Sequence, residues 1–505
     1  MTEELDTKLN PSITNHPGQL KPPTPGGVKT GFLYAFILVI GIGSFQFGYS
    51  IGVFNPLQND FAYLFGWDKD RQKFMSSLIT SICSLGSAVG SIGVGPFTKY
   101  GKKNCLLFAN LLVIIGAGIT TVRNEVAVIV GRFIYGLATG SFSVLVPSYI
   151  NEVAPTELKG PLGAVTQILI TVGIMIAFFL GIPVPNIVYF EVYDRFLPED
   201  QQLTFASDNY WRILFALPIA FSLFQTIMLL TVFNYETPKF LKQTNQHAQL
   251  NKLMGNIYES DRIKERIDAI IVETGVGKQT SPSYKETLCH PRYRYATFLG
   301  CALSVLQQLS GINAVMFYSS KIFEKMNVND KLGSGLVGFI NMISTFGALF
   351  LLGKFGRKTL LWVQSFVMGA VLIGLGIAFL YVDTDKTAQI FCVIFILLFV
   401  VLFEFSLGPI PWLYMAEIMT EKGLSIAILL NWLMTIVMGI LTPFVISGAL
   451  FMVFGVLCCI CALFCLFLLK ETQGLSEADV ALLYSAEKEQ AYNQLDNVDN
   501  GSSQH

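Results

Sequence analysis

The chain has 505 residues, of which 52% are hydrophobic and only 14% are charged, and its formal net charge is −1. Soluble globular domains carry about 25% charged residues, so this composition excludes an ordinary soluble protein. The net charge indicates no particular partner, and we expect none among nucleic acids.

Both ends of the chain are polar. The first 30 residues contain five prolines and lack the apolar core of a secretory signal, so we expect no cleavable signal. We predict a disordered, cytosolic N-terminal segment over residues 1–30 and a cytosolic tail over residues 470–505.

Uncharged runs fill most of the chain between these ends, and a helix needs roughly 20 apolar residues to cross the hydrocarbon core of a membrane. The longest run, Leu424–Leu469, folds back at Ser447-Gly448 and counts as two spans. The other predicted spans are Phe32–Asn59, Phe74–Thr98, Asn104–Val122, Glu125–Ile150, Gly160–Phe190, Ile213–Asn234, Tyr295–Ser320, Leu332–Gly353, Thr359–Val382 and Thr387–Tyr414. Because a bilayer offers no hydrogen-bond partners to sheet edges, we predict an all-α membrane protein with twelve transmembrane helices.

A charged segment, Tyr235–Arg292, divides these spans six and six. We predict an N-terminal bundle over residues 31–234, a cytosolic helical linker over 235–292 and a C-terminal bundle over 293–469. Basic residues in the short loops favour a cytosolic N-terminus by the positive-inside rule. Four linker residues follow helical spacing and indicate an amphipathic surface helix, although a solvated linker explains them equally well. They are Ile263, Ile267, Ile270 and Ile271.

Three short patterns occur once in each half, in the same order. They are Tyr100-Gly-Lys-Lys103 and Phe355-Gly-Arg-Lys358, Tyr149-Ile-Asn-Glu152 and Tyr414-Met-Ala-Glu417, and Glu236-Thr-Pro238 and Glu471-Thr-Gln473. Such ordered recurrence indicates two homologous six-helix halves in parallel repeat. In that architecture the substrate site lies between the halves near the middle of the membrane, and rocking of the halves exposes it alternately to each side.

Three amide side chains interrupt one span, in Gln307-Gln-Leu-Ser-Gly-Ile-Asn313. An amide moved into hydrocarbon without a partner costs roughly 2–7 kcal/mol. On an unbroken helix, Gln308 and Asn313 would point about 140° apart. Ser310-Gly311 supplies a natural break, because glycine adopts backbone conformations that other residues avoid. We predict a discontinuous span whose amides converge on a polar ligand or on water.

These motifs make the chain resemble the sugar porters of the major facilitator superfamily, the glucose facilitators in particular, over roughly residues 31–475. The resemblance implies the major facilitator fold of two pseudo-symmetric six-helix bundles and transport of a hexose such as glucose. Amides suit a hexose because they donate and accept hydrogen bonds, as sugar hydroxyls do. The matching segments are Gly43-Ser-Phe-Gln-Phe-Gly-Tyr49, Gly131-Arg-Phe133, Val146-Pro-Ser-Tyr-Ile-Asn-Glu152, Glu236-Thr-Pro-Lys-Phe-Leu241, Gln307-Gln-Leu-Ser-Gly-Ile-Asn313, Gly408-Pro-Ile-Pro-Trp412, Asn431-Trp432 and Glu471-Thr-Gln-Gly474.

The resemblance also implies which residues contact the sugar. They are Gln167, Gln307, Gln308, Asn313, Asn341, Glu404 and Trp412, with Asn431 as a secondary candidate. Phe317 and Tyr318 resemble the outer gate aromatics of the family. A plainer interpretation exists for each: amides also hold helices together, at about 0.6–2 kcal/mol per contact, and the aromatic residues also serve as core packing.

A second set of residues is implied to gate the inner face. In the family, such basic and acidic side chains tie the halves together while the cavity faces outward. Here they are Lys102, Lys103, Arg357, Lys358, Glu152, Glu236, Glu417 and Glu471. Several arginines of the family are lysines in this chain, and lysine cannot form the bidentate contact that arginine makes with a carboxylate. We therefore predict a weaker tie and more time facing inward; solvated charges without a gating role are the alternative.

Carboxylates within the spans bear on the transport mode. Proton-coupled members of the family carry an acid directly after the Phe-Gly-Tyr of the first span, where this chain has Ser50. We therefore predict facilitated diffusion. Glu404 is an acid in the middle of a span, so a proton-coupled sugar or polyol symporter is the alternative. A transporter-like sugar sensor is a third alternative, although such sensors usually need a longer tail.

No catalytic constellation, cofactor site or metal site is expected, and the protein is not predicted to be an enzyme. The four histidines lie outside the spans, and the nine cysteines suggest no disulfide framework. The expected partners are a small-molecule sugar and the lipid bilayer, with the protein acting as a monomer. The family implies the plasma membrane, and the sequence leaves open which sugar is carried.

Overall fold

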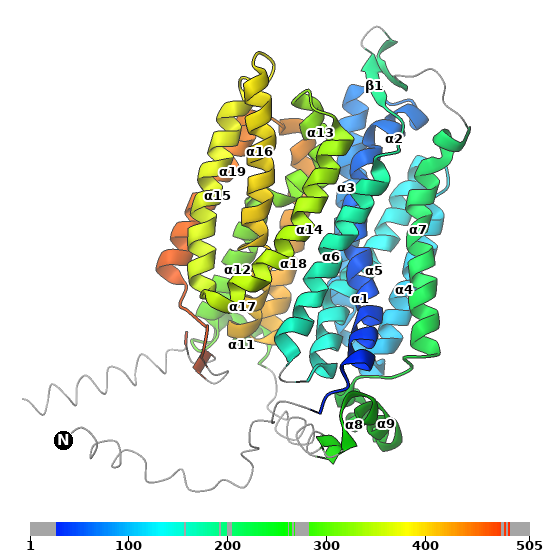
Figure 1. Cartoon of the computed structure of the whole chain (residues 1–505), viewed down its shortest axis with the longest axis vertical. Coiled ribbons are helices and arrows are strands. Elements are labelled where there is room, and N and C mark those ends of the chain that lie inside the picture. Colours follow the sequence, from blue (N-terminus) through cyan, green and yellow to red (C-terminus); the bar gives the residue numbers. More distant parts are fainter. Residues whose placement is uncertain are drawn as a thin grey trace, which may run out of the picture.

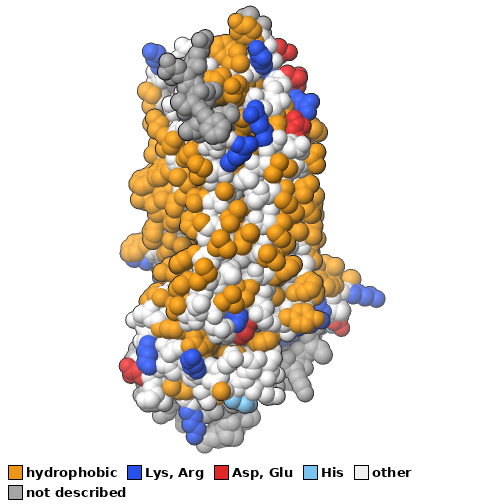
Figure 2. Space-filling view, turned by 90° about the vertical axis from the view of Figure 1, so that its right-hand side faces the viewer, with side chains coloured by type: hydrophobic (Ala, Val, Ile, Leu, Met, Phe, Trp, Pro, Cys, Tyr) orange, Lys and Arg blue, Asp and Glu red, His pale blue; other side chains and the backbone are white. Residues whose placement is uncertain are grey.

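The computed structural model describes residues 27–155, 158–190, 193–198, 205–260, 262–264, 267, 282–475, 479–480 and 483–484. Within these residues, 12 helices are long and apolar enough to cross a membrane, which confirms the predicted all-α membrane fold (Figure 1). On the face that Figure 2 shows, charged side chains gather toward the two ends, and the belt between them is mostly apolar. The chain is an integral membrane protein.

The helices fall into two halves. The first half contains α1 (Thr30–Gly52), η1 (Asn55–Leu57), α2 (Gln58–Phe65), α3 (Lys69–Gly93), η2 (Gly95–Tyr100), α4 (Lys102–Thr120), α5 (Glu125–Val153), α6 (Lys159–Gly181), the strands β1 (Ile187–Phe190) and β2 (Arg195–Pro198), and α7 (Phe205–Leu230). The second half contains α12 (Arg294–Leu309), α13 (Ile312–Lys325), α14 (Asp330–Lys354), α15 (Arg357–Phe379), α16 (Lys386–Glu404), α17 (Ile410–Ile418), α18 (Glu421–Val445) and α19 (Gly448–Leu468).

Short helices of the linker lie at one end of the bundle, namely α8 (Pro238–Gln243), α9 (His247–Ile257) and α11 (Tyr284–Cys289). We call this end the linker end and the opposite end, where β1 and β2 lie, the hairpin end (Figure 1). α8 and α9 pack on the first half, because Leu241 and Leu253 are buried in one of its clusters. Of the predicted amphipathic helix, Ile263 and Ile267 pack against the same cluster, whereas residues 270 and 271 lie outside the described residues.

One predicted span ends in a strand rather than in a helix. The span expected over Gly160–Phe190 ends with α6 at Gly181, and its last four residues form β1 instead. β1 pairs antiparallel with β2, from Ile187 opposite Pro198 to Phe190 opposite Arg195. The segment Ile-Val-Tyr-Phe is apolar, but its β-branched and aromatic residues favour a strand. Hydropathy alone does not separate such a strand from the end of a helix.

Two spans of the second half are interrupted. α12 ends at Leu309 and α13 begins at Ile312, and Gly311 between them has φ 88°, so the predicted break in the seventh span is confirmed. The tenth span is likewise divided into α16 and α17. This second break is not among the sequence predictions, although Gly408-Pro409 marks it.

The repeated sequence patterns make equivalent contacts in the two halves. The Glu236 carboxylate accepts a hydrogen bond from the backbone N–H of Lys103 (3.1 Å) at the start of α4. The Glu471 carboxylate accepts one from the backbone N–H of Arg357 (2.8 Å) at the start of α15. Both acids therefore neutralise the positive end of a helix dipole. The equivalence supports a parallel repeat of two six-helix units.

Two tyrosines repeat in the same way. The Tyr149 hydroxyl donates to the backbone oxygen of Tyr235, the residue before Glu236. The Tyr414 hydroxyl donates to the backbone oxygen of Lys470 (2.7 Å), the residue before Glu471. Each half therefore fixes the end of its own last span to its own interior.

Candidate functional site

The break in the seventh span depends on Gly311. Its φ of 88° lies in the left-handed region, which residues with a Cβ disfavour. A Cβ at this position would also lie 2.4 Å from Cδ2 of Phe454 in α19. The break turns the start of α13 relative to α12, so side chains on either side of it can face the same space.

Four amides meet at this break. Asn431 of α18 donates through Nδ2 to Oε1 of Gln307 (2.7 Å) and accepts at Oδ1 from Nε2 of Gln308 (2.8 Å). Asn313 donates to Oε1 of Gln308 (2.5 Å). Gln307, Gln308 and Asn431 are 3%, 6% and 5% exposed. The structure thus brings together the three amides of the seventh span and adds Asn431 as the residue that joins them.

These amides form hydrogen bonds mainly with one another. This is the pattern expected if the amides hold helices together, which is the alternative to sugar binding. Gln307 also donates to the backbone oxygen of Leu407 (2.6 Å), in the break of the tenth span. Asn313 is only half-buried, and among the described residues no hydrogen bond reaches its Oδ1. An amide pair that can exchange its mutual hydrogen bond for one to a hydroxyl is suited to reversible binding.

A second polar group surrounds Glu404, which is 2% exposed at the end of α16. Its carboxylate accepts hydrogen bonds from Asn341 Nδ2 (2.8 Å), Thr345 Oγ1 (3.2 Å) and Gln167 Nε2 (3.4 Å). Gln167 belongs to α6 and the others to the second half, so this group crosses between the halves. Thr345 also bonds to Thr171 Oγ1 of α6 (3.3 Å). The buried carboxylate is therefore well supplied with donors.

Two buried oxygens, one in α14 and one in α6, lack a hydrogen-bond partner among the described residues. They are Oδ1 of Asn341 and Oγ1 of Thr166, the neighbour of Gln167. A buried acceptor without a partner costs about 1–3 kcal/mol. A hydroxylated ligand that donated to either oxygen would recover that cost.

The aromatic candidates occupy different places. Trp412 in α17 is half-buried, and no hydrogen bond or ring contact joins it to other described residues. Phe317 and Tyr318 are buried in α13, and the Tyr318 hydroxyl donates to the backbone oxygen of Gly439 (2.6 Å). Trp432, which the sequence analysis did not assign to the site, lies 5.6 Å from the ring of Phe47 in the other half.

The halves are joined at the hairpin end. Asn55 of η1 donates to the backbone oxygen of Met316 (3.0 Å) and accepts from the backbone N–H of Ser320 (3.1 Å). Gln58 donates to the backbone oxygen of Phe317 (2.9 Å). These contacts link the end of the first span to α13 of the second half. The hairpin end is therefore closed in this conformation.

Ion pairs at the linker end stay within each half. Lys102 pairs with Glu152 at 2.8 Å and Arg357 pairs with Glu417 at 3.2 Å. No ion pair among the described residues joins the two halves at this end, so the predicted tie between halves is not formed in this conformation. Burial raises the pKa of the Glu236 carboxyl above its ordinary value, while backbone N–H groups of α4 lower it by a smaller amount.

Lys103 and Lys358 are the remaining basic residues predicted to gate this end, and their contacts with described residues also lie within their own half. The Lys103 ammonium donates to Oδ1 of Asn234 (2.6 Å). The backbone N–H of Lys358 donates to Glu471 (3.1 Å).

Arg132 of α5 is 2% exposed. Its Nη2 donates to the backbone oxygen of Ser50 (3.2 Å), and its guanidinium lies 6.0 Å from the ring centroid of Phe215. No carboxylate pairs with it among the described residues. The buried guanidinium therefore contacts a backbone oxygen and an aromatic ring.

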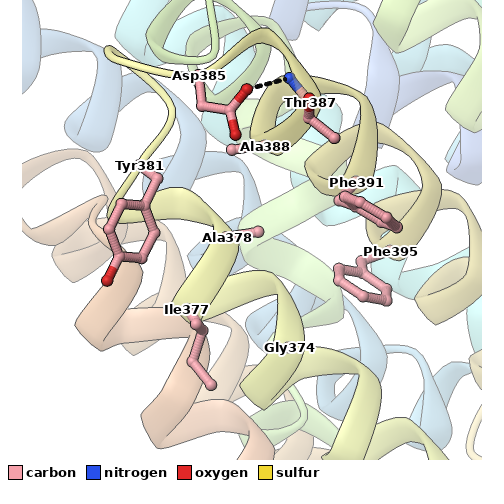
Figure 3. A pocket seen from close by; sticks show the side chains of 9 residues that line it. All are labelled: Gly374, Ile377, Ala378, Tyr381, Asp385, Thr387, Ala388, Phe391 and Phe395. Atoms are coloured by element: carbon pink, nitrogen blue, oxygen red, sulfur yellow. Dashed lines mark hydrogen bonds between the residues drawn. The ribbon is translucent and has the colours of Figure 1, made fainter.

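A shallow depression lies between α15 and α16 near the hairpin end (Figure 3). Its walls are apolar apart from its rim, where Asp385 accepts a hydrogen bond from the backbone N–H of Thr387 (2.8 Å). It contains none of the predicted site residues and lies on the outside of the second half. The depression is therefore separate from the polar groups between the halves.

Sequence signals existed for some residues that the predictions omit. Thr345 follows Asn341 by four residues, and Thr171 follows Gln167 by four, so each lies one helical turn from a predicted residue on the same face. Asn55 carried no such signal, because its partners are two backbone groups and the Ser319 hydroxyl of a distant helix.

Comparisons with known proteins show which family the chain belongs to. A family model described as "Sugar (and other) transporter" matches residues 36–484. Hexose transporter 1 of Toxoplasma gondii is 29% identical over 470 residues, covering 87% of this chain and 80% of that one. The facilitated glucose transporter member 3 (solute carrier family 2) of Ovis aries is 29% identical over 472 residues, covering 88% and 91%.

Solved structures share the fold. The inward-open xylose transporter XylE of E. coli superposes with a TM-score of 0.71 at 22% identity, over 89% of this chain and 99% of that one. XylE bound to 6-bromo-6-deoxy-D-glucose gives 0.72 at 22% identity, over 90% and 100%. Because the family model spans most of the chain, the protein belongs to the sugar (and other) transporter family and is a transporter rather than an enzyme.

Proposed function

We propose that the protein is a facilitative carrier that moves a hexose such as glucose across a membrane by alternating access. The observation that carries this proposal is the row of uncharged amides from Asn313 to Gln307, next to a polar group that spans the two halves. A neutral polyhydroxylated ligand matches such groups, because each amide can donate and accept. The names of the relatives support a hexose.

The proposed sugar contacts are Gln167, Gln307, Gln308, Asn313, Asn341, Glu404 and Trp412. On binding, hydroxyls replace the hydrogen bonds that the amides make with one another. Asn341 Oδ1, which has no hydrogen-bond partner among the described residues, gains a donor. Trp412 supplies an apolar face for the C–H surface of the sugar ring. Because one set of hydrogen bonds replaces another, affinity stays moderate and the sugar can leave on either side.

The transport mode is proposed to be uniport. Ser50 places no carboxylate beside Arg132, so this pair offers no site for a coupled proton. The observation that favours proton symport instead is Glu404, a buried carboxylate bonded to Gln167 across the halves. Proteoliposome uptake with and without an imposed proton gradient separates the two, because only a symporter accumulates sugar in response to the gradient.

The orientation and location are part of the proposal. We place the linker end, both termini and the linker over residues 235–292 in the cytosol, and the protein in the plasma membrane as a monomer. The two bundles are assigned to residues 31–234 and 293–469. The conformation described here then faces inward, because its closed hairpin end is the extracellular end.

Uptake of labelled hexoses by proteoliposomes of the purified protein tests the function. We expect saturable uptake that unlabelled glucose competes for and that reaches, but does not exceed, the outside concentration. Gln308→Ala should raise KM, whereas Gln473→Ala, an amide change outside the spans, should not. Failure of every hexose in a competition panel to enter would contradict the proposal.

A further inference from the structure

The hairpin end is held closed by more than the contacts of η1 with α13. We propose that the hairpin segment, residues 184–190 and 193–198, fastens the second half to the first, and that Lys331 is the main residue that binds it. This inference rests on the proposed alternating access: the hairpin segment would stabilise the state in which the hairpin end is closed.

Lys331 lies in the first turn of α14, in the second half, and is 7% exposed. Its Nζ donates hydrogen bonds to the backbone oxygen of Val184 and to Oδ1 of Asn186, the latter at 3.0 Å. Both partners lie in the first half, between α6 and β1. A buried ammonium group is costly unless hydrogen bonds replace its hydration. Separation of the halves would therefore remove partners that this lysine needs while it is buried.

A second lysine of the same half reaches the same segment. The Nζ of Lys321 in α13 lies 5.5 Å from the ring centroid of Phe196 in β2. An ammonium group over an aromatic face is attracted by the ring electrons. Lys321 also donates to Oδ1 of Asn59 in α2 and contacts Glu324 at 3.0 Å. Two cations of the second half thus contact one short segment of the first.

The hairpin segment itself is anchored in the first half. Asn59 donates through Nδ2 to the backbone oxygen of Ile187 (3.0 Å). Ile187 and Phe196 are 4% and 3% exposed, and the Phe196 ring lies 5.1 Å from that of Tyr189. The segment therefore moves with the first half. Any opening of the hairpin end must break its contacts with Lys331 and Lys321.

The distance between the halves tests this assignment without any sugar. Val122 and Tyr381 are exposed at the hairpin end, one in each half. Spin labels on cysteines introduced at these two positions report the separation of the halves by pulsed electron paramagnetic resonance. The accessible native cysteines are replaced by serine. We expect Lys331→Met to raise the ratio of open to closed distances about tenfold, which corresponds to about 1.4 kcal/mol.

Two lysine variants serve as controls. Lys386→Met removes an exposed lysine from the first turn of another helix at the same end and should leave the ratio unchanged. Lys331→Arg retains a cation with several donors and should open the end less than Lys331→Met.

Phe196→Leu removes the ring under Lys321 and should shift the ratio in the same direction by a smaller amount, which keeps the test available if Lys331→Met does not fold. Unchanged distances in the folded variants would overturn the inference. Absence of hexose uptake by the unmodified protein would instead contradict the proposed function and leave the distance result standing.

Discussion

Replacement of Gly311 by alanine is a direct test of the broken seventh span. The φ of 88° is a region that residues with a Cβ disfavour by about 1–2 kcal/mol. The new Cβ would lie 2.4 Å from Cδ2 and 2.7 Å from Cε2 of Phe454, and forcing a carbon into a packed site costs roughly 1–3 kcal/mol. Gly311→Ala should therefore lose about 2–5 kcal/mol of stability, a large share of the roughly 5–15 kcal/mol typical of folded proteins.

The two parts of this cost can be separated by thermal unfolding in detergent. Phe454→Leu combined with Gly311→Ala removes the ring contact but not the backbone cost, so the double variant should recover part of the lost melting temperature. Gly118→Ala is the control, because its Cβ position has no heavy atom within 4 Å apart from its chain neighbours and its own helix backbone, and alanine is preferred inside a helix. We also expect Gly311→Ala to raise the KM for hexose, since the amides on either side of the break would no longer converge. The role given to Gly311 would be refuted if Gly311→Ala had the same melting temperature as Gly118→Ala and an unchanged KM for hexose.

Four further predictions follow from named contacts. Asn431→Leu removes the residue that joins the amides and leaves two buried polar groups without a hydrogen-bond partner, at about 1–3 kcal/mol each. The KM for hexose should therefore rise at least about tenfold. Asn431→Gln should retain part of the affinity. Glu404→Gln should leave uptake indifferent to an imposed proton gradient, as in the unmodified protein; a response that the substitution abolishes would establish symport. Burial raises the pKa of the Glu236 carboxyl above its ordinary value, so in the pH range between the ordinary and the raised pKa the folded state binds more protons than the unfolded state. The stability that Glu236 confers should therefore fall as pH rises through this window, and the melting temperature of the unmodified protein relative to Glu236→Gln should fall with it. Arginine can hold carboxylates in a bidentate contact, so Lys102→Arg should strengthen the tie between the halves at the linker end. Sugar exchange should then slow, or the open fraction at the hairpin end should increase. No change in either measurement would contradict the prediction of a weak tie.

The fold was predictable because its signals are long. A membrane span needs many consecutive apolar residues, so a few polar residues within it do not change the number of spans predicted. Several motifs occur once in each half, so the two-fold repeat does not depend on any one of them. The exception was β1, four residues whose hydropathy matches a helix end and whose conformation is set by pairing with β2 and by packing on α2. Tertiary contacts of this kind leave no trace in a hydropathy pattern.

The polar site was predictable in part. The break at Gly311 could be inferred from the angle between Gln308 and Asn313, because helical geometry is fixed locally. The placement of Asn431 between Gln307 and Gln308 depends on how α18 packs against α12, which no spacing within either helix encodes. Asn55 was missed for the same reason, since its partners are carbonyl and amide groups of α13.

The bonds of Asn55 and Gln58 to backbone groups have a consequence for the environments in which the carrier can work. These contacts are neutral, and each contributes only about 0.5–1.5 kcal/mol. Dissolved ions screen interactions between charges and leave neutral hydrogen bonds nearly untouched. These two contacts can break without separating a cation from an anion, so their share of the closing free energy is the same at low and at high ionic strength.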